Sequence, residues 1–387
     1  MKFAFLLFKY FPESGLARDA LALAGRLAAR GHAVEMIAGD WRGPRPAAAG
    51  VTLLGRRGWT NHGRDADFAR RAPAAADGCD AVVGFNRMPG LDIHYAADPC
   101  LAAALARRPA WQRRTPRNRA RLAFERGVFG PAAATRSLLL SPQQPPDIAA
   151  HYGTPAERWL LLPPDIGRDR RRPPDAPAIR QAARAELGIA AEDWLLLALG
   201  SHFRTKGVDR TVRALAELPA ALRRRTRLAV VGQGKAAPLV ALAGRLGVAD
   251  RLLLLGARDD VPRLLLAADL LVHPARLENT GQAILEAIVA GLPVLAGAAC
   301  GFAPHVEHAG AGLVLPEPFA AGRLAADLAA MLEPGRLAAW SANGAAYGRT
   351  EDLYGGLDAA AAVIERWTAA RLSDRDPRPA GSAARSR

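Results

Sequence analysis

The run Glu278-Asn279-Thr280-Gly281-Gln282-Ala283-Ile284-Leu285-Glu286 carries two glutamates with seven residues between them, inside a regular apolar pattern. An apolar stretch at 270–272 precedes the run, and His273-Pro274 ends that stretch. After the run, Gly291 ends the helical pattern and a new apolar stretch covers 294–296. This order predicts a strand, a loop, a short helix with glycine just beyond its C-terminus, and a second strand.

The start of this helix is the first expected binding feature. Asn279 and Thr280 are residue types that cap helices, so we expect the helix to begin there. Its first amides would carry partial positive charge, which suits a phosphate. Glu278 would lie just before the helix, and Glu286 about two turns into it. Two carboxylates on either side of such a helix end suit a nucleotide sugar. The alternative is an ordinary strand–helix–strand unit with two solvated glutamates.

Length and composition favour a two-domain α/β protein. With 387 residues, half of them apolar and 6% aromatic, the chain can form two separate cores. The three cysteines are an odd number without metal-ligand spacing, which indicates a reducing compartment. The apolar start, 1–9, is too short for a secretion signal and is expected to be a buried strand. No segment has transmembrane length without charges, so we expect a cytoplasmic protein.

Close to half of the formal charge of +15 comes from a basic segment at 107–126, which holds eight arginines and a single acid, Glu125. Thr115-Pro116 is a good helix start, so a helix should run past Arg117 and Arg121. Leu122, Phe124 and Phe129 are expected apolar anchors beside it. A basic, partly amphipathic helix favours binding to an anionic membrane surface. The membrane-binding residues that we predict are Arg107, Arg108, Trp111, Arg113, Arg114, Arg117 and Arg121. The alternatives are a solvated helix or a nucleic-acid site, but the segment has no recognisable nucleic-acid motif.

Strands and helices alternate along both halves of the chain, which predicts two parallel sheets. In the first half we expect strands at 2–8, 34–38, 81–84, 93–97 and 137–140, with Asn86 and Asp98 at carboxyl ends, where ligands bind in such sheets. Residues 153–177 are expected to link the domains. In the second half we expect strands at 194–199, 228–232, 252–255, 270–272 and 294–296. A last helix is expected at 357–372, followed by a disordered tail at 373–387.

Several motifs together resemble the bacterial lipopolysaccharide core glucosyltransferase I family, a group of retaining glycosyltransferases of family 4 with two Rossmann-like domains (the GT-B fold). The resemblance rests on the glutamate run and on Gly15-Leu16 with Arg18-Asp19, residues 60–64, residues 84–92, and Lys206-Gly207-Val208-Asp209-Arg210. It implies an N-terminal acceptor and membrane-facing domain at 1–163, a nucleotide-sugar domain at 164–350, and helices at 351–372 that pack back on the first domain. It also implies a donor cleft between the domains.

The same resemblance implies roles for single residues. Lys206 matches a phosphate-binding lysine, Glu278 the acid facing the sugar, and Glu286 the ribose-binding acid. Gly15 and Asp19 match the glycine and acid near the donor sugar. Asp98 is expected to face the acceptor because it stands at a strand end. The other expected donor-binding residues are Arg170, Arg258, Asn279, Thr280, Gly281 and Gln282. One departure concerns the phosphate loop, because Thr205 stands where the family carries arginine; Arg204 comes one residue earlier.

The resemblance implies transfer of a hexose, expected to be glucose from UDP-glucose, onto a heptose of the lipopolysaccharide inner core, which starts the outer core. No cofactor, metal or nucleic acid is expected as a partner, and the enzyme is expected at the inner face of the bacterial inner membrane. Three alternatives remain: a sugar-nucleotide epimerase on the same fold, a different donor sugar such as galactose or an aminosugar, and a non-catalytic binder. Gly232-Gln233-Gly234 follows a strand but lacks the third glycine of a dinucleotide fingerprint. His273 is expected to be a satisfied core histidine.

Overall fold

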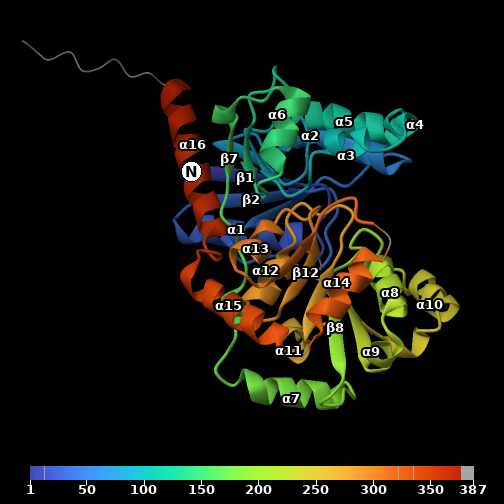
Figure 1. Ribbon diagram of the computed structural model, residues 1–387. Helices are drawn as coiled ribbons and strands as arrows, with labels where there is room; N and C mark the ends of the chain where they lie inside the picture. The colour runs from blue at the N-terminus through green and yellow to red at the C-terminus, as the bar shows by residue number, and fades with distance from the viewer. Residues whose placement is uncertain (13, 321, 334, 376–387) are drawn as a thin grey trace, which may run out of the picture. The chain divides into compact units, whose positions relative to one another are not determined.

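The computed structural model describes residues 1–12, 14–320, 322–333 and 335–375. These residues form two compact units, each built on one sheet (Figure 1). Unit 1 consists of 1–140, 144–163 and the chain from 355, and unit 2 consists of 141–143 and 164–354. Residues 351–354, which the sequence assigned to the returning helices, therefore belong to unit 2.

The sheet of unit 1 is parallel and has the strand order β3-β2-β1-β4-β5-β6-β7. Its strands are β1 (Lys2–Leu7), β2 (Ala33–Ala38), β3 (Gly50–Leu53), β4 (Ala81–Gly84), β5 (Ile93–Ala96), β6 (Arg136–Leu139) and β7 (Trp159–Leu161). The strands expected from the sequence are present, but β3 was missed. At the edge of the sheet β7 pairs with β6, so residues 159–161 of the predicted linker form a strand of unit 1.

Helices cover both faces of this sheet, because successive side chains of each strand point to opposite faces. Phe3, Phe5 and Leu7 join one core, while Ala4 and Leu6 join the other. The helices are α1 (Gly15–Ala29), α2 (Asn61–Ala75), α3 (Leu101–Ala106), α4 (Ala110–Arg113), α5 (Pro116–Phe129), α6 (Gln144–Tyr152) and α16 (Gly356–Arg375), with a 3₁₀ turn at Ala156–Arg158.

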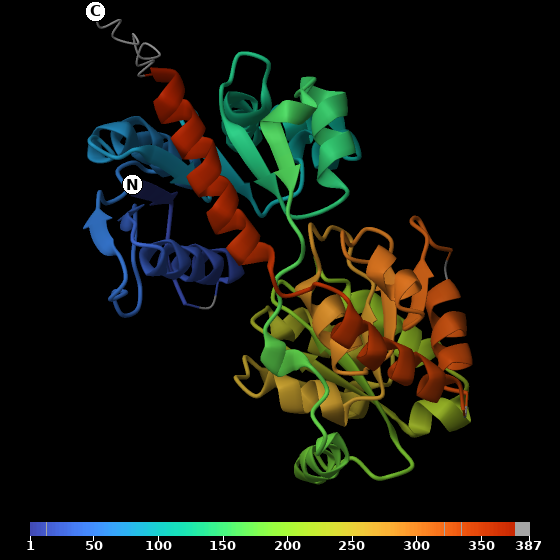
Figure 2. The same ribbon diagram turned by 90° about the vertical axis from the view of Figure 1, so that its left-hand side faces the viewer.

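The last helix, α16, returns to unit 1 and packs along α1 (Figure 2). Ala360 and Ile364 enter the core beside β1, and Glu365 accepts a hydrogen bond from Arg30 at 2.8 Å. The helix continues through Arg375, so the prediction of a disordered tail from Ser373 was wrong for residues 373–375. Residues 376–387 of that tail lie outside the described residues.

The sheet of unit 2 is also parallel, with the strand order β10-β9-β8-β11-β12-β13. Its strands are β8 (Trp194–Leu199), β9 (Thr226–Val231), β10 (Leu252–Gly256), β11 (Leu270–His273), β12 (Val294–Gly297) and β13 (Gly312–Leu315). Its helices are α7 (Ala176–Glu186), α8 (Val208–Glu217), α9 (Ala220–Arg224), α10 (Ala236–Arg245), α11 (Val261–Ala267), α12 (Gln282–Val289), α13 (Pro304–His308), α14 (Arg323–Met331) and α15 (Arg336–Thr350), with 3₁₀ turns at Arg168–Arg170 and Ala249–Arg251. Both units therefore have the doubly wound order of Rossmann-like domains.

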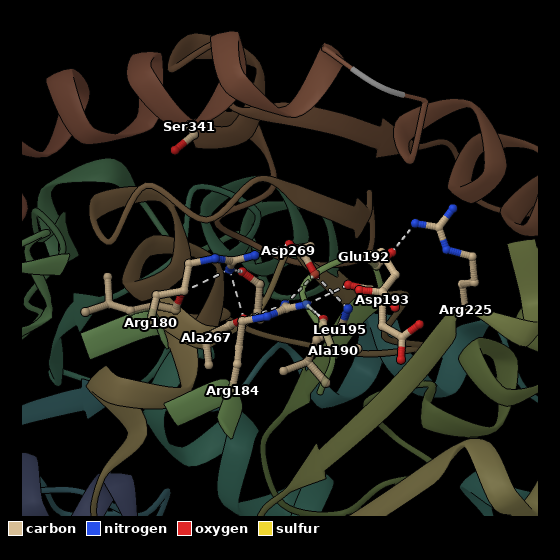
Figure 3. A network of polar contacts seen from close by, with 12 residues as sticks. Arg180, Arg184, Ala190, Glu192, Asp193, Leu195, Arg225, Ala267, Asp269 and Ser341 are labelled. Carbon is tan, nitrogen blue, oxygen red and sulfur yellow. Dashed lines mark hydrogen bonds and ion pairs between the residues drawn. The ribbon is translucent and has the colours of Figure 1, made fainter. Parts of the chain in front are cut away.

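A buried ionic network holds α7 to the amino ends of the strands in unit 2 (Figure 3). The carboxylate of Asp269 accepts from Arg180, from Arg184 at 3.0 Å and from the amide of Leu195 at 2.7 Å. Arg180 also donates to the last carbonyls of α11, with 2.7 Å to Ala268. Removing one member of such a network strongly lowers the free energy of unfolding, because the remaining charges are buried without a counter-charge.

We therefore expect Asp269→Asn to lower the free energy of unfolding by about 3 kcal/mol, because two guanidinium groups lose their counter-charge. Chemical denaturation of the two proteins measures this difference. The control is Asp327→Asn, which removes an exposed i,i+4 pair with Arg323 and should cost below about 1 kcal/mol. Equal losses in both variants would contradict the role given to the network.

Candidate functional site

The two strands at the centre of the unit 2 sheet, β8 and β11, lie side by side where the strand order reverses. Such a switch point leaves a crevice at the carboxyl ends of the strands, where α/β proteins bind their ligands. The loop at 200–207 follows β8, and the loop at 274–281 follows β11. Lys206 and Glu278 come from these two loops.

The backbone of the first loop is bent so that Lys206 stands at the start of α8. His202 adopts a left-handed conformation with φ 61°, which is costly for a residue with a side chain. Its carbonyl accepts hydrogen bonds from the amides of Thr205, at 2.8 Å, and of Lys206, at 3.2 Å. Gly207 caps α8 with φ 74°, and a Cβ there would overlap the carbonyl oxygen of Pro274. The two loops are thus in backbone contact.

The helix after the second loop begins later than the sequence indicated. We expected Asn279 or Thr280 to start it, but α12 begins at Gln282 with Gly281 as its cap, at φ 96°. The reason is that the preceding residues extend the sheet: Glu278 bridges to Cys300, and the carbonyl of Thr280 accepts from the amide of Phe302 at 2.7 Å. Asn279 is buried in this extension, and Gln282 is exposed at the helix start.

Lys206 and Glu278 meet directly, with Lys206 Nζ on Glu278 Oε2. Both side chains are largely covered, and burial lowers the pKa of Lys206. The sequence predicted that one of these groups binds phosphate and the other faces a sugar. The structure brings them together as an ion pair at the switch point.

A second acid–base pair lies at the other end of the glutamate run. Arg170 Nε is 3.3 Å from Glu286 Oε1, and the same guanidinium contacts Asp169 at 3.1 Å. Arg170 lies on the segment that leads into unit 2. The backbone of this segment is held to α12, because the amide of Arg172 donates to the carbonyl of Val289. Arg170 and Glu286 were predicted separately as donor-binding residues, and the structure makes them neighbours.

His273, the last residue of β11, differs from its prediction. It is 2% exposed, as expected for a core histidine, but its Nε2 has no hydrogen-bond partner and is therefore not satisfied. This nitrogen lies 3.6 Å from Glu278 Oε2. Burial, and then the charge of Lys206, lower the pKa of His273 to about 3. The imidazole is consequently neutral at physiological pH.

Arg276 is a residue that the sequence reasoning missed. Its guanidinium forms two bonds with Asp209 at the start of α8, at 2.7 and 2.8 Å, and a third with the carbonyl of Arg204 at 2.8 Å. Its amide donates to the carbonyl of Thr205 at 2.9 Å. The loop that carries Lys206 is therefore fastened to the loop that carries Glu278. The only signal in the sequence was Asp209, inside a motif quoted for the resemblance.

The remaining predicted donor residue of unit 2, Arg258, follows β10 and is held by Asp260 through two bonds of 2.7 Å. Its binding role stays a prediction. The Gly232-Gln233-Gly234 sequence serves packing between loops: a Cβ at Gly232 would lie 2.5 Å from the carbonyl of Gly200, and one at Gly234 equally close to the Phe203 ring. These contacts explain both glycines without a dinucleotide.

In unit 1 the predicted residues lie around the corresponding edge of the sheet. Gly15 is the first residue of α1, and the space where its side chain would lie is open. Asp19, one turn on, accepts from the hydroxyl of Tyr95 at 3.2 Å. Asp98 is exposed just past β5, and its carbonyl accepts from Arg87 at 2.7 Å. Their catalytic roles stay predictions.

The basic segment at 107–126 presents one sign of charge. Thr115 caps α5 as predicted, accepting from the amide of Asn118 at 3.3 Å. All eight arginines are exposed, and Trp111 is 66% exposed. The one acid, Glu125, is buried and binds Arg87 and the first amides of α3. Phe129 lies in the core and is therefore no anchor for an outside surface, contrary to expectation.

None of the helices among the described residues is both long and apolar enough to cross a membrane. In the same part of the chain, no three His, Cys, Asp or Glu side chains are grouped closely enough to hold a metal ion.

Comparisons with known proteins place this geometry in a family. The model of the glycosyl transferases group 1 family matches residues 179–346, which include both loops. The lipopolysaccharide glucosyltransferase WaaG of Escherichia coli K12 is 42% identical over 370 residues, covering 93% of this chain and 98% of that protein. The chain belongs to the WaaG family of glycosyltransferases.

The solved structures agree with this membership. A crystal structure of WaaG, described as a glycosyltransferase involved in lipopolysaccharide biosynthesis, superimposes with a TM-score of 0.88 over 94% of this chain and 99% of that one. Anabaena Alr3699/HepE, solved with UDP and glucose, has a TM-score of 0.71 over 97% of this chain and all of its own, at 20% identity, which shows a shared fold. The prediction of a two-domain glycosyltransferase is confirmed.

If Arg276 fastens the Lys206 loop, Arg276→Ala should make the amides of residues 201–207 exchange with solvent about tenfold faster, because local opening costs less. Hydrogen exchange read by mass spectrometry measures this. Arg258→Ala is the matched control, since it removes an equally exposed two-bond pair with Asp260 and should leave 201–207 unchanged. Unchanged exchange in Arg276→Ala would show that the loop holds its shape without this arginine.

Proposed function

We propose that this chain is a retaining glucosyltransferase that moves glucose from UDP-glucose onto a heptose of the lipopolysaccharide inner core. The observation that carries the proposal is the Lys206–Glu278 pair at the switch point of a chain that matches WaaG over nearly its whole length. The name of that relative supplies the reaction class, and the side chains supply the groups which the chemistry needs.

The chemistry requires positive charge where the diphosphate departs. In glycosyl transfer the sugar approaches an oxocarbenium ion while negative charge grows on the leaving oxygen. Lys206 and the first amides of α12 would stabilise that charge, since both stand at the carboxyl ends of the strands. Glu278 would face the sugar and Glu286, held by Arg170, the ribose. We propose that these cations and dipoles suffice and that the reaction needs no metal ion.

The acceptor side is assigned to unit 1. Asp19, oriented by Tyr95, would face the donor sugar, and Asp98 the acceptor hydroxyl. A lipopolysaccharide precursor is a membrane lipid, so its enzyme benefits from a surface that binds anionic headgroups. We propose that the basic segment, with Trp111, provides this surface at the cytoplasmic face of the inner membrane.

We expect the purified chain to transfer glucose from UDP-glucose to heptose-terminated lipopolysaccharide in the presence of EDTA, measured by mass spectrometry of the acceptor. Lys206→Ala should lower kcat/KM by at least about 100-fold, because the leaving diphosphate loses a positioned charge. Lys235→Ala, a lysine exposed at the start of α10, is the control and should keep full activity.

A screen of other UDP-sugars in the same assay identifies a different donor if glucose is not used. Conversion of the donor sugar without acceptor would favour the epimerase. Absence of transfer from every donor, with and without added Mg²⁺ or Mn²⁺, would refute the proposed reaction.

The membrane surface can be tested separately. Replacing Arg113, Arg114, Arg117 and Arg121 by glutamine should weaken binding to phosphatidylglycerol-containing vesicles by at least about 100-fold, because each arginine near an anionic surface contributes on the order of 1 kcal/mol. Vesicle sedimentation measures the partition, and 0.5 M salt, roughly the regime where such charges are screened, should abolish it in the parent protein.

The control removes the same charge from unit 2, by replacing the exposed residues Arg213, Arg224, Arg245 and Arg349 with glutamine. If both sets weaken vesicle binding equally, net charge and not the basic segment explains the attraction.

A further inference from the structure

His273 holds an unexplained polar atom at the centre of the site. Its ring is buried at the end of β11, and its Nε2 has no hydrogen-bond partner. A buried N–H or ring nitrogen that gives up water without a partner costs about 1–3 kcal/mol. Buried polar groups of native proteins are nearly always paired, so an orphan at a site calls for a reason.

The geometry around this nitrogen suggests the reason. Glu278 Oε2 lies 3.6 Å away, just beyond hydrogen-bond length, and Lys206 Nζ occupies the same oxygen. Glu278 Oε2 therefore contacts Lys206 Nζ. His273 Nε2 would have to move by less than about 1 Å to come within hydrogen-bond distance of the same oxygen. The backbone of His273 pairs with Ala296 in the sheet, and its carbonyl accepts from the Cys300 thiol at 3.8 Å. The side chain therefore starts from a fixed backbone, and its Nε2 has no hydrogen-bond partner.

Lys206 cannot serve two anions equally well. In the proposed reaction it meets a diphosphate, which carries more charge than one carboxylate and attracts the ammonium group away from Glu278. A carboxylate as covered as Glu278 would then lose its counter-charge, and an unpaired carboxylate in such surroundings is strongly destabilised. A neutral donor next to it would keep the carboxylate ionised and oriented.

We infer that His273 is a positioning residue, whose Nε2–H takes over the Glu278 carboxylate when Lys206 turns to the diphosphate of the donor. The inference rests on the proposed function and adds a residue to it. The proton stands on Nε2 in the tautomer that can donate, and no proton is transferred. His273 touches neither the sugar nor the phosphate; it acts through Glu278.

A neutral ring fits this exchange of partners. The pKa of about 3 keeps the imidazole uncharged at any working pH. An imidazolium beside Lys206 would repel it and would bind Glu278 permanently. A neutral N–H forms a weaker hydrogen bond to a carboxylate than the Lys206 ammonium does. His273 therefore bonds to Glu278 only after the lysine has moved away.

The test compares His273→Leu, which keeps an apolar side chain in the space, with His273→Gln, whose amide can donate from near the Nε2 position. We expect His273→Leu to lower kcat by about 30-fold or more while the donor KM changes by less than about threefold, because a misplaced carboxylate harms the transition state more than binding. His273→Gln should recover most of kcat. Initial rates over a range of UDP-glucose concentrations separate the two constants.

His94→Leu is the matched control. His94 is equally buried, also has an unpaired Nε2 and a pKa lowered to about 3, but it lies in unit 1 with its Nδ1 on the carbonyl of Gly84 at 2.9 Å. It should lose thermal stability much as His273→Leu does and keep its kcat. A double variant, His273→Leu with Glu278→Gln, should be no slower than Glu278→Gln alone, because a residue that acts through Glu278 has nothing left to position.

Three results would overturn the inference: a kcat of His273→Leu within twofold of the parent, a folded His273→Gln as slow as His273→Leu, or losses of the single variants that multiply in the double variant. Each of these leaves the proposed function intact, since the parent enzyme is active in all of them. A parent enzyme that transfers no sugar refutes the proposed function, and the role of His273 falls with it.

Discussion

The contact between Lys206 and Glu278 is the interaction on which the proposed chemistry of this protein depends. It exists because β8 and β11 are neighbours in the sheet, as the strand order β10-β9-β8-β11 shows. In the sequence, 70 residues separate Leu199, at the end of β8, from Leu270, at the start of β11. The parallel sheet brings both strands to the same edge with their carboxyl ends together. Lys206 and Glu278, the proposed partners of the leaving group and of the sugar, then meet although no local sequence motif joins them.

Rigidity around this contact comes from backbone and arginine contacts between the two loops. Gly207 lets the start of α8 approach Pro274, and Arg276 bonds both to Asp209 and to the carbonyl of Arg204. The strained backbone of His202 is held by its own hydrogen bonds, to the carbonyl of Gln233 and from the amides of Thr205 and Lys206. In the proposed mechanism this fastening keeps the two loops in place, while the Lys206 side chain exchanges Glu278 for the diphosphate.

Local patterns in the sequence predicted local structure well. Thr115-Pro116 marked the start of α5, and apolar runs marked most strands, because capping and strand burial depend on nearby residues. Resemblance to a family supplied most of the predicted site residues. The predicted start of α12 was wrong, because Thr280 pairs with Phe302 in an extension of the sheet. Arg276 and His273 could not be assigned roles, because their partners are near only after the chain has folded.

The fastening of the two loops has a consequence for altering sugar preference by engineering. Because the segments after β8 and after β11 touch through Gly207 and Pro274 and share Arg276, they behave as one structural part supplied by two stretches of chain. Grafting one stretch from a relative would mismatch it with its resident partner. To change the sugar preference, both loops have to be replaced together by the corresponding pair of loops from the same relative.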